Sequence, residues 1–127
     1  MTEGADPRGH VVAVVVAHDD PSMRETLGKI LTEAGCVVLL ARDGHEALEM
    51  LIDGLQPSFV VLDAELSGVD GCTVARRMSR HPALRRVAVA ILAAGARRLP
   101  ARAHRLQIPL DAEQLLAFAR ALPQLTD

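Results

Sequence analysis

The chain of 127 residues has no tryptophan and no tyrosine, and its aromatic side chains are the phenylalanines Phe59 and Phe118. Since 50% of its residues are nevertheless hydrophobic, its core must be built from Ala, Val, Leu and Ile. A chain of this length can bury one sizeable core, and its hydrophobicity excludes a disordered polymer. We therefore expect a single folded domain.

Lysine and hydroxyl side chains are scarce as well. Lys29 is the only lysine, and no Ser, Thr or Tyr occurs between Arg80 and Leu125. A lysine Schiff base or a serine nucleophile from the last third of the chain is thereby excluded.

The two cysteines, Cys36 and Cys72, have neither metal-ligand spacing nor a CxxC motif, so we expect buried thiols in a reducing compartment. Met1–His10 is polar and lacks the layout of a signal peptide, and no apolar run is long enough to span a bilayer. These features predict a cytoplasmic protein without a membrane partner.

Charge is divided unevenly along the chain. Residues 1–70 hold 13 Asp and Glu against 4 Lys and Arg, whereas residues 71–127 hold 3 against 10. Nine arginines lie between residues 76 and 105 without one acid: Arg76, Arg77, Arg80, Arg85, Arg86, Arg97, Arg98, Arg102 and Arg105. No aromatic residue is interleaved for base stacking, so a solvated face or an acidic protein partner is favoured over nucleic acid.

Apolar runs alternate with helical patterns along the whole chain. Strands are predicted at Val11–Ala17, Cys36–Ala41, Phe59–Leu62, Val87–Leu92 and Arg105–Ile108. Asp20, Asp43 and Asp111 can each cap a helix, a further helix follows Asp70, and Ala93–His104 is ambiguous. Such alternation predicts an α/β fold whose parallel sheet is covered by helices on both faces.

Acidic residues follow two of the predicted strands. Asp19 and Asp20 come after the first strand, and Asp63 ends the third. In a parallel sheet these carboxylates would converge at one edge, where oxygen ligands suit Mg²⁺ and one carboxylate could act as a nucleophile in phosphoryl transfer. The alternative is that Asp20 only caps a helix and Asp63 only ends a strand.

At these residues the chain resembles a known family. His18–Arg24 resembles the acidic turn of response-regulator receiver domains, while Val60–Asp63 and Gly68–Gly71 resemble the phospho-acceptor strand and its loop. The separation of 44 residues between Asp19 and Asp63 also matches. The resemblance implies a flavodoxin-like, doubly wound (βα)5 fold with strand order 2-1-3-4-5. Its domain would span residues 11–122, between a disordered tail of residues 1–10 and a C-terminal tail of residues 123–127.

The resemblance also assigns roles to site residues. Asp63 matches the aspartate that accepts a phosphoryl group from a histidine kinase or a small phosphodonor. Asp19 matches an acid that ligates Mg²⁺ directly, and the backbone carbonyl of Glu65 would supply another ligand. A register shifted by one residue would bring Asp20 into the metal site instead.

Four positions depart from the family pattern: His18, Ala93, Arg105 and Ile108. His18 replaces a metal-site acid, Ala93 replaces a hydroxyl residue, and Ile108 replaces a lysine that pairs with the phosphoryl oxygens. Arg105 stands at the aromatic position of the fifth strand.

Pro109 matches a family proline whose preceding bond is commonly cis. The segment from Ala93 to Ile108 is shorter than usual by roughly two helical turns. The fourth helix is therefore expected to be shortened or irregular.

Together these features predict a degenerate receiver of two-component signalling, which acts mainly through protein–protein interaction and is weakly phosphorylated at Asp63, or not at all. We expect weak Mg²⁺ binding or none, a histidine kinase or other signalling protein as partner, and no nucleic acid; a homodimer is left open. A conventional Mg²⁺-dependent receiver phosphorylated on Asp63 is the first alternative, and binding of nucleic acid or an acidic partner through the arginines of residues 76–105 is the second.

Enzyme functions fit less well. An aspartate-dependent phosphatase would need an aspartate where Glu65 stands and a later lysine. A dinucleotide-binding protein would carry a GxGxxG motif after the first strand, and a flavin site would carry a Ser/Thr-rich phosphate loop. We therefore do not expect an enzyme.

Overall fold

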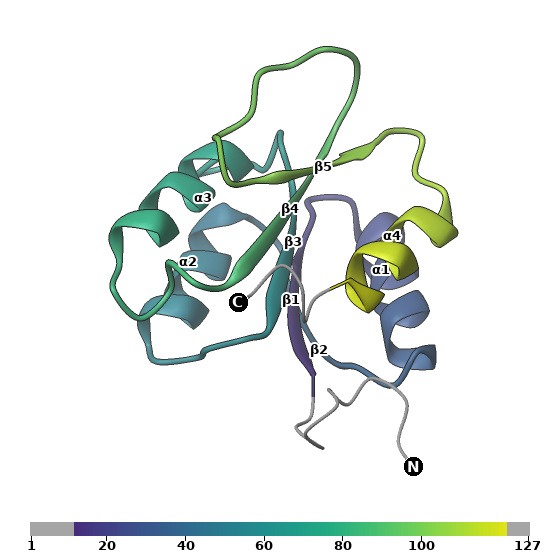
Figure 1. The fold of residues 1–127 in the computed structure, drawn as a ribbon, viewed down its shortest axis with the longest axis horizontal. Coiled ribbons are helices and arrows are strands. Elements are labelled where there is room, and N and C mark those ends of the chain that lie inside the picture. Colours follow the sequence, from purple (N-terminus) through teal and green to yellow (C-terminus); the bar gives the residue numbers. More distant parts are fainter. Residues whose placement is uncertain (1–11, 122–127) are drawn as a thin grey trace.

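A computed structural model describes residues 12–121, which form five strands and four helices (Figure 1). In chain order the elements are β1 (Ala13–Ala17), α1 (Pro21–Glu33), β2 (Val37–Ala41), α2 (Gly44–Ile52), β3 (Phe59–Asp63), α3 (Gly71–Arg80), β4 (Ala88–Ala93), β5 (His104–Gln107) and α4 (Ala112–Arg120). The strands form one parallel sheet in the order β2-β1-β3-β4-β5, which confirms the predicted fold class. The predicted tails, residues 1–10 and 123–127, lie outside the described residues.

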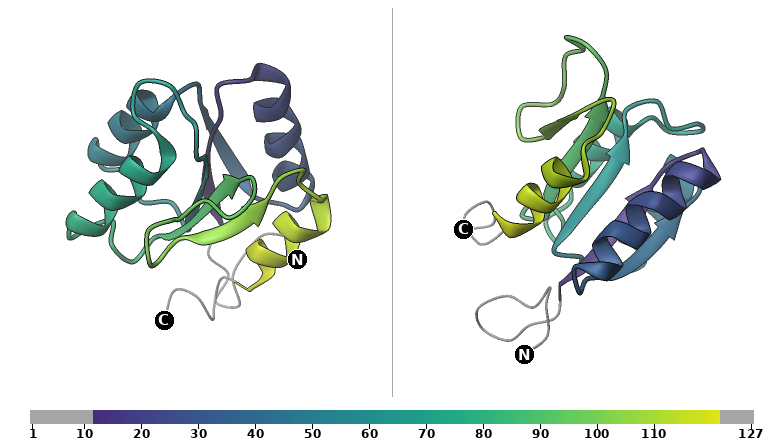
Figure 2. Two further views of the ribbon diagram at one scale, coloured as in Figure 1. Left: turned by 90° about the horizontal axis from the view of Figure 1, so that it is seen from above. Right: turned by 90° about the vertical axis from the view of Figure 1, so that its right-hand side faces the viewer.

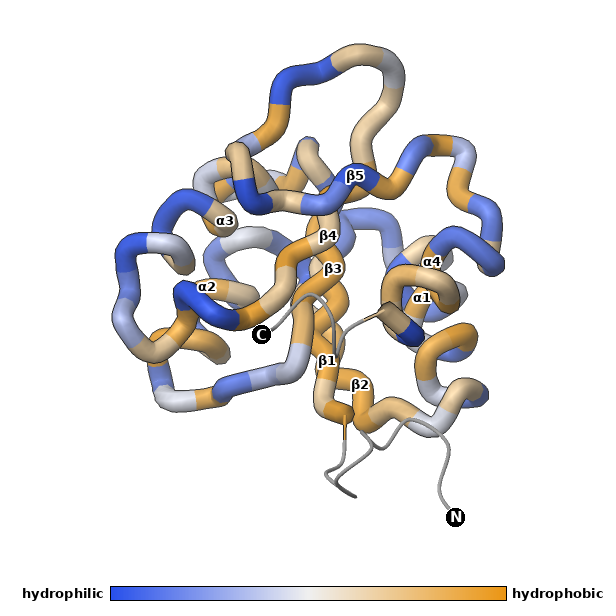
Figure 3. Tube along the Cα trace, in the orientation of Figure 1, coloured by the Kyte–Doolittle hydropathy of each residue, from blue (hydrophilic) through white to orange (hydrophobic). Residues whose placement is uncertain are grey.

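The strands of the sheet other than β5 are strongly apolar (Figure 3), and the three central ones, β1, β3 and β4, are almost entirely buried. Every residue of β4 is buried, and so are the first four of β3, because helices or loops cover both faces of the sheet there. The edge strand β2 is more open, with Val37, Leu39 and Leu40 exposed. The central position of β3 matters for the site, since its last residue, Asp63, emerges between two neighbouring strands.

Each helix begins at an aspartate that accepts a backbone N–H. Asp20 caps α1 through Ser22, while the caps of α2, α3 and α4 are Asp43, Asp70 and Asp111. The three caps predicted from the sequence are confirmed. A short carboxylate at this position satisfies one of the free amide groups of the first helical turn.

Helices cover the two faces of the sheet in pairs, α1 with α4 and α2 with α3 (Figure 2). Beneath α1 and α4, Phe59 and Phe118 meet edge to face with their ring centroids 5.2 Å apart. Beneath α2 and α3 the core consists of aliphatic side chains, Met78 and Cys72, and both cysteines are buried free thiols. Both phenylalanines of the chain thus pack together in the core on one face of the sheet.

The connection from β4 to β5 differs from the prediction. A shortened or irregular fourth helix was expected there, but residues 94–103 form only turns and irregular loop. Gly95 has a positive φ of 61°, and Pro100 lacks the N–H that a helix interior needs, so no helix can run through both. The segment is instead tied together by Arg105, whose guanidinium donates to the carbonyls of Gly95 and Arg97.

Two further details complete the fold. The peptide bond between Ile108 and Pro109 is cis. No helix within residues 12–121 is both long and apolar enough to cross a membrane.

Candidate functional site

The carboxyl ends of β1 and β3 lie side by side. Ala17 pairs with Leu62 in the parallel ladder, so the residues that follow β1 face the last residue of β3. On the other side Asp63 pairs with Leu92 of β4. The topology therefore brings His18, Asp19 and Asp63 to one edge of the sheet, as the sequence predicted for the two aspartates.

At this edge the side chains of His18 and Asp63 contact each other. Nε2 of His18 lies 3.5 Å from Oδ2 of Asp63, and the two side chains are only 13% and 16% exposed. Nδ1 of His18 accepts the backbone N–H of Asp20 at 3.1 Å. Because one ring nitrogen accepts, the ring proton belongs on Nε2, which faces the Asp63 carboxylate.

The Asp19 carboxylate is engaged by the loop that follows β3. Both of its oxygens lie 3.0 Å from the backbone nitrogen of Ser67, which donates to them. Arg24 secures the same turn, since its guanidinium donates to the carbonyl of His18 at 2.7 Å. Asp19 thus holds two loops together across 48 residues of sequence.

The carboxylates of Asp20 and Glu65 take no part in the contact between His18 and Asp63. The Asp20 carboxylate caps α1 by accepting the N–H of Ser22 at 3.0 Å. The N–H of Glu65 donates to Asp63 at 3.4 Å, and its exposed carboxylate pairs with Arg97, also at 3.4 Å. The shifted register that would bring Asp20 into the site therefore conflicts with its capping role.

The positions beside Asp63 on β4 and β5 carry no hydroxyl or amine. Ala93 is buried at the end of β4, paired with Gln107 of β5. Ile108 is 40% exposed, and its N–H donates to the carbonyl of Ala93. The Arg105 side chain is directed to the β4–β5 loop rather than to Asp63.

The backbone behind the site is packed closely at Gly71. A Cβ placed on Gly71 would lie 2.3 Å from the carbonyl oxygen of Asp63, which is far below contact distance. The N–H of Gly71 donates to Ala64. The sequence marked Gly68–Gly71 only as a turn, and this close approach has no signal in the sequence besides the glycine itself.

The response regulator receiver domain model matches residues 14–111, most of the chain. This chain belongs to the response regulator receiver family. It is 40% identical over 67 residues to response regulator MprA of Mycobacterium ulcerans, a match that covers 53% of this chain and 28% of that relative. The receiver thus spans little more than a quarter of the length of this curated relative.

Solved receiver structures show the same fold. A response regulator receiver protein from Sinorhizobium medicae superposes with a TM-score of 0.82 at 23% identity, over 92% of this chain and 98% of that one. The receiver domain of a sensor histidine kinase from Pseudomonas aeruginosa superposes with a TM-score of 0.79 at 19% identity, over 88% and 97% of the two chains. That second structure has a magnesium ion coordinated in its active site cleft.

The side chains that the family pattern implies as magnesium ligands already have other partners in the structure. Within residues 12–121, no group of three or more His, Cys, Asp or Glu side chains is placed to hold a metal ion. The ring of His18 stands against Asp63, and the N–H of Ser67 occupies both oxygens of Asp19. Since Mg²⁺ prefers oxygen ligands in near-octahedral geometry, an imidazole at this position does not fit it.

Proposed function

We propose that this receiver is an atypical one, which acts mainly as a protein–protein interaction module in two-component signalling and is phosphorylated at Asp63 weakly or not at all. The observation that carries the proposal is the surroundings of Asp63. Its carboxylate faces the imidazole of His18 at 3.5 Å, while Ala93 and Ile108 stand at the positions of the hydroxyl and the lysine. The domain proposed for this role comprises residues 11–122.

The missing groups bear on the rate of phosphorylation. Phosphoryl transfer is accelerated mostly by positioning and by stabilising the charge on the transferred group. Asp63 retains a partly exposed carboxylate that could attack a phosphodonor. Without an amine or a hydroxyl to contact the phosphoryl oxygens, its reaction is expected to be slow.

Magnesium binding is proposed to be weak or absent for a related reason. Asp19, Asp63 and the backbone carbonyl of Glu65 are the ligands that the family pattern implies. In the structure both oxygens of Asp19 accept the N–H of Ser67, so an ion would share this carboxylate with that donor. The imidazole of His18 stands where the family pattern has a further carboxylate, and the loss of that oxygen ligand lowers the affinity for Mg²⁺.

A phosphoryl group on Asp63 would also have few neighbouring side chains to attract and displace. A population shift requires an interaction that differs between two conformations of the protein. Here no hydroxyl at Ala93 and no amine at Ile108 can be drawn toward the group. The proposed output is therefore constitutive binding to a histidine kinase or another signalling protein, and catalysis is not part of it.

The test is exposure of the protein to Mg²⁺ and acetyl phosphate, followed by intact-mass measurement. We expect most of the protein to remain unmodified. A triple variant that restores the family residues, His18→Asp with Ala93→Thr and Ile108→Lys, is expected to gain one phosphoryl group, and Asp63→Ala in that background should abolish the gain.

The main alternative is a conventional receiver, which the retained Asp19 and Asp63 favour. A rapid, stoichiometric mass gain by the wild-type protein, lost in Asp63→Ala, would overturn the proposal and establish that alternative. A beryllofluoride complex that reshapes residues 93–109 would have the same consequence.

A further inference from the structure

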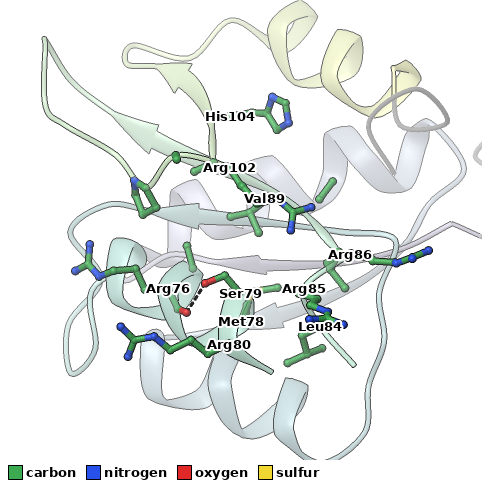
Figure 4. A pocket seen from close by; sticks show the side chains of 16 residues that line it. Arg76, Met78, Ser79, Arg80, Leu84, Arg85, Arg86, Val89, Arg102 and His104 are labelled. Atoms are coloured by element: carbon green, nitrogen blue, oxygen red, sulfur yellow. Dashed lines mark hydrogen bonds between the residues drawn. The ribbon is translucent and has the colours of Figure 1, made fainter. Parts of the chain in front are cut away.

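The β4–β5 connection leaves part of the sheet without a helix. The connections β1–β2, β2–β3 and β3–β4 each carry one, whereas residues 94–103 between β4 and β5 form a loop. Beside this loop lies a pocket of about 710 Å³, bounded by α3, the α3–β4 connection and residues 100–104 (Figure 4). The pocket opens where a covering helix is missing, next to α3.

The pocket has an apolar floor. Met78, Leu84 and Val89 line it, and each of them also belongs to the core between the sheet and α2–α3. Ala75 and Ala103 add small side chains that leave the space open. Met78 and Leu84 are at most 2% exposed, so the floor is the outer layer of the core itself. A concave site floored by the apolar core and edged by polar groups is typical of a binding pocket.

Arginines surround this floor. Five of the nine arginines between residues 76 and 105 line the pocket: Arg76, Arg80, Arg85, Arg86 and Arg102. Arg76 and Arg80 lie four residues apart on α3, on the same side of the helix. In the sequence all nine belong to one stretch without acids. Only the fold separates the arginines at the pocket from the others.

None of these five side chains forms an ion pair within the described part of the chain. No acidic residue lines the pocket, and within residues 12–121 none lies within ion-pair distance of the five. Arg76 donates to the hydroxyl of Thr73 at 3.4 Å, and its charge acts on Asp70 only from beyond ion-pair distance. Clustered like charges repel one another, so an acidic partner gains attraction here and relieves that repulsion.

We propose that this pocket binds an amphipathic helix with acidic flanks, which a partner protein supplies. The inference rests on the proposed interaction role and names the partner's chemistry. Apolar side chains at helical spacing would occupy the floor, and aspartates or glutamates on both sides would pair with the arginines, which bind carboxylates in a bidentate manner. The helix would lie beside α3, which has 10 residues and is therefore about 15 Å long.

Two other occupants fit the pocket less well. Nucleic acid would use the charge but not the apolar floor, and no Phe, Tyr or Trp lines the pocket for base stacking. A second copy of this chain would have to bring its acidic half to the pocket, a head-to-tail contact that extends into a filament unless it closes as a ring.

The first experiment is a selection of helical peptides. A phage-displayed library of random peptides is selected on the full chain alone, and the variants are kept for the affinity measurements. We expect the surviving sequences to combine Asp and Glu with apolar residues spaced three and four apart. Survivors that are neutral or basic, or the absence of any survivor, would overturn the proposal.

The second experiment measures the affinity of the best peptide for matched variants by fluorescence anisotropy. Arg80→Glu/Arg102→Glu is expected to weaken binding at least about tenfold, since it replaces attraction by repulsion. Ala101→Trp, which fills the pocket from an exposed position without changing charge, should also weaken it about tenfold. Arg77→Glu is the control, because Arg77 is exposed on α3 but does not line the pocket, and its effect should stay within about twofold.

Several outcomes would contradict the assignment. If Arg77→Glu weakened peptide binding as much as the double variant, the affinity would depend on the overall positive charge and not on this pocket. Tighter binding of duplex DNA than of any peptide, lost in the double variant, would assign the pocket to nucleic acid, and self-association lost in that variant would assign it to a second copy. Selected peptides that bind equally well to the double variant and Ala101→Trp would leave the interaction role intact and refute this pocket alone.

Discussion

The two faces of the sheet are covered differently. On the face of α1 and α4, helices lie against a core that includes the pair Phe59 and Phe118. On the face of α2 and α3, α3 packs against β4, but the connection from β4 to β5 is the loop of residues 94–103, with Leu99 packed partly against the core. We call the first the closed face and the second, where the pocket lies, the open face.

This difference shows which parts of the receiver fold are retained. The strand ends, the helix caps and the glycine behind Asp63 keep their packing. Between β4 and β5 the described residues form a loop, and Ala93 and Ile108 lie at or just after the ends of those strands. The irregular connection and the two residues on which the proposed function rests therefore belong to the same two strands.

The largest expected effect compares the core of the closed face with the loop of the open one. Phe59→Ala should lower the free energy of unfolding by about 3–5 kcal/mol, because it leaves a cavity beneath Phe118. Leu99→Ala should cost about 1 kcal/mol, since Leu99 is only partly buried. Urea unfolding followed by far-ultraviolet circular dichroism measures both; equal costs would mean that the loop belongs fully to the core.

A middle-sized effect tests whether the Asp63 end of the open face is packed as closely as the structure shows. Gly71→Ala should destabilise the protein by about 1–3 kcal/mol, because the new methyl group would overlap the carbonyl of Asp63. Gly28→Ala in α1 is the matched control, since its methyl group would meet only the flexible end of Leu40 at 3.0 Å. A helix interior also favours alanine over glycine by roughly 0.5–1 kcal/mol, so the control should be neutral or stabilising. Equal destabilisation by the two variants would contradict the close approach at Gly71.

The smallest expected effect concerns the cap of α3. The backbone N–H of Thr73 lowers the pKa of Asp70 below its ordinary value of 3.8, with a smaller contribution from the charge of Arg76. A lowered pKa stabilises the folded protein above pH 3.8, and that contribution is lost as the pH falls through the folded-state pKa. Asp70→Asn keeps a capping side chain but removes the charge, and should cost about 0.3–1 kcal/mol at pH 7.

The pH dependence of that variant provides the check. The free energies of unfolding of wild type and Asp70→Asn should converge as the pH falls from 3.8 through the folded-state pKa of Asp70, because protonation makes the two side chains nearly equivalent. A difference that is the same at pH 7 and at the lowest pH where the protein is still folded would show that the charge of Asp70 contributes nothing. Asp43→Asn, which alters the cap of α2, provides a comparison at a second helix on the same face.

The sequence predicted the fold because its signals are local and agree with one another. Continuous β-branched runs, aspartate caps and helical spacing place β1, α1 and β3 within two residues of where they lie. The meeting of Asp19 and Asp63 at one edge follows from strand order alone. For the β4–β5 segment a shortened or irregular helix was predicted, whereas the structure has no helix there. The composition could not show that hydrogen bonds from Arg105 would hold this segment as a loop.

By itself, the sequence determined the fold class, the strand ends at which Asp19 and Asp63 lie, and the absence of lysine and hydroxyl residues between Arg80 and Leu125, because these depend on residue type and order. Only the tertiary structure decided what the remaining groups do. It placed His18 against Asp63, turned Asp19 to the backbone of Ser67, and gathered five of nine arginines around an apolar pocket. Such contacts join residues far apart in the chain, and their geometry exists only once the strands are paired and the helices packed on them.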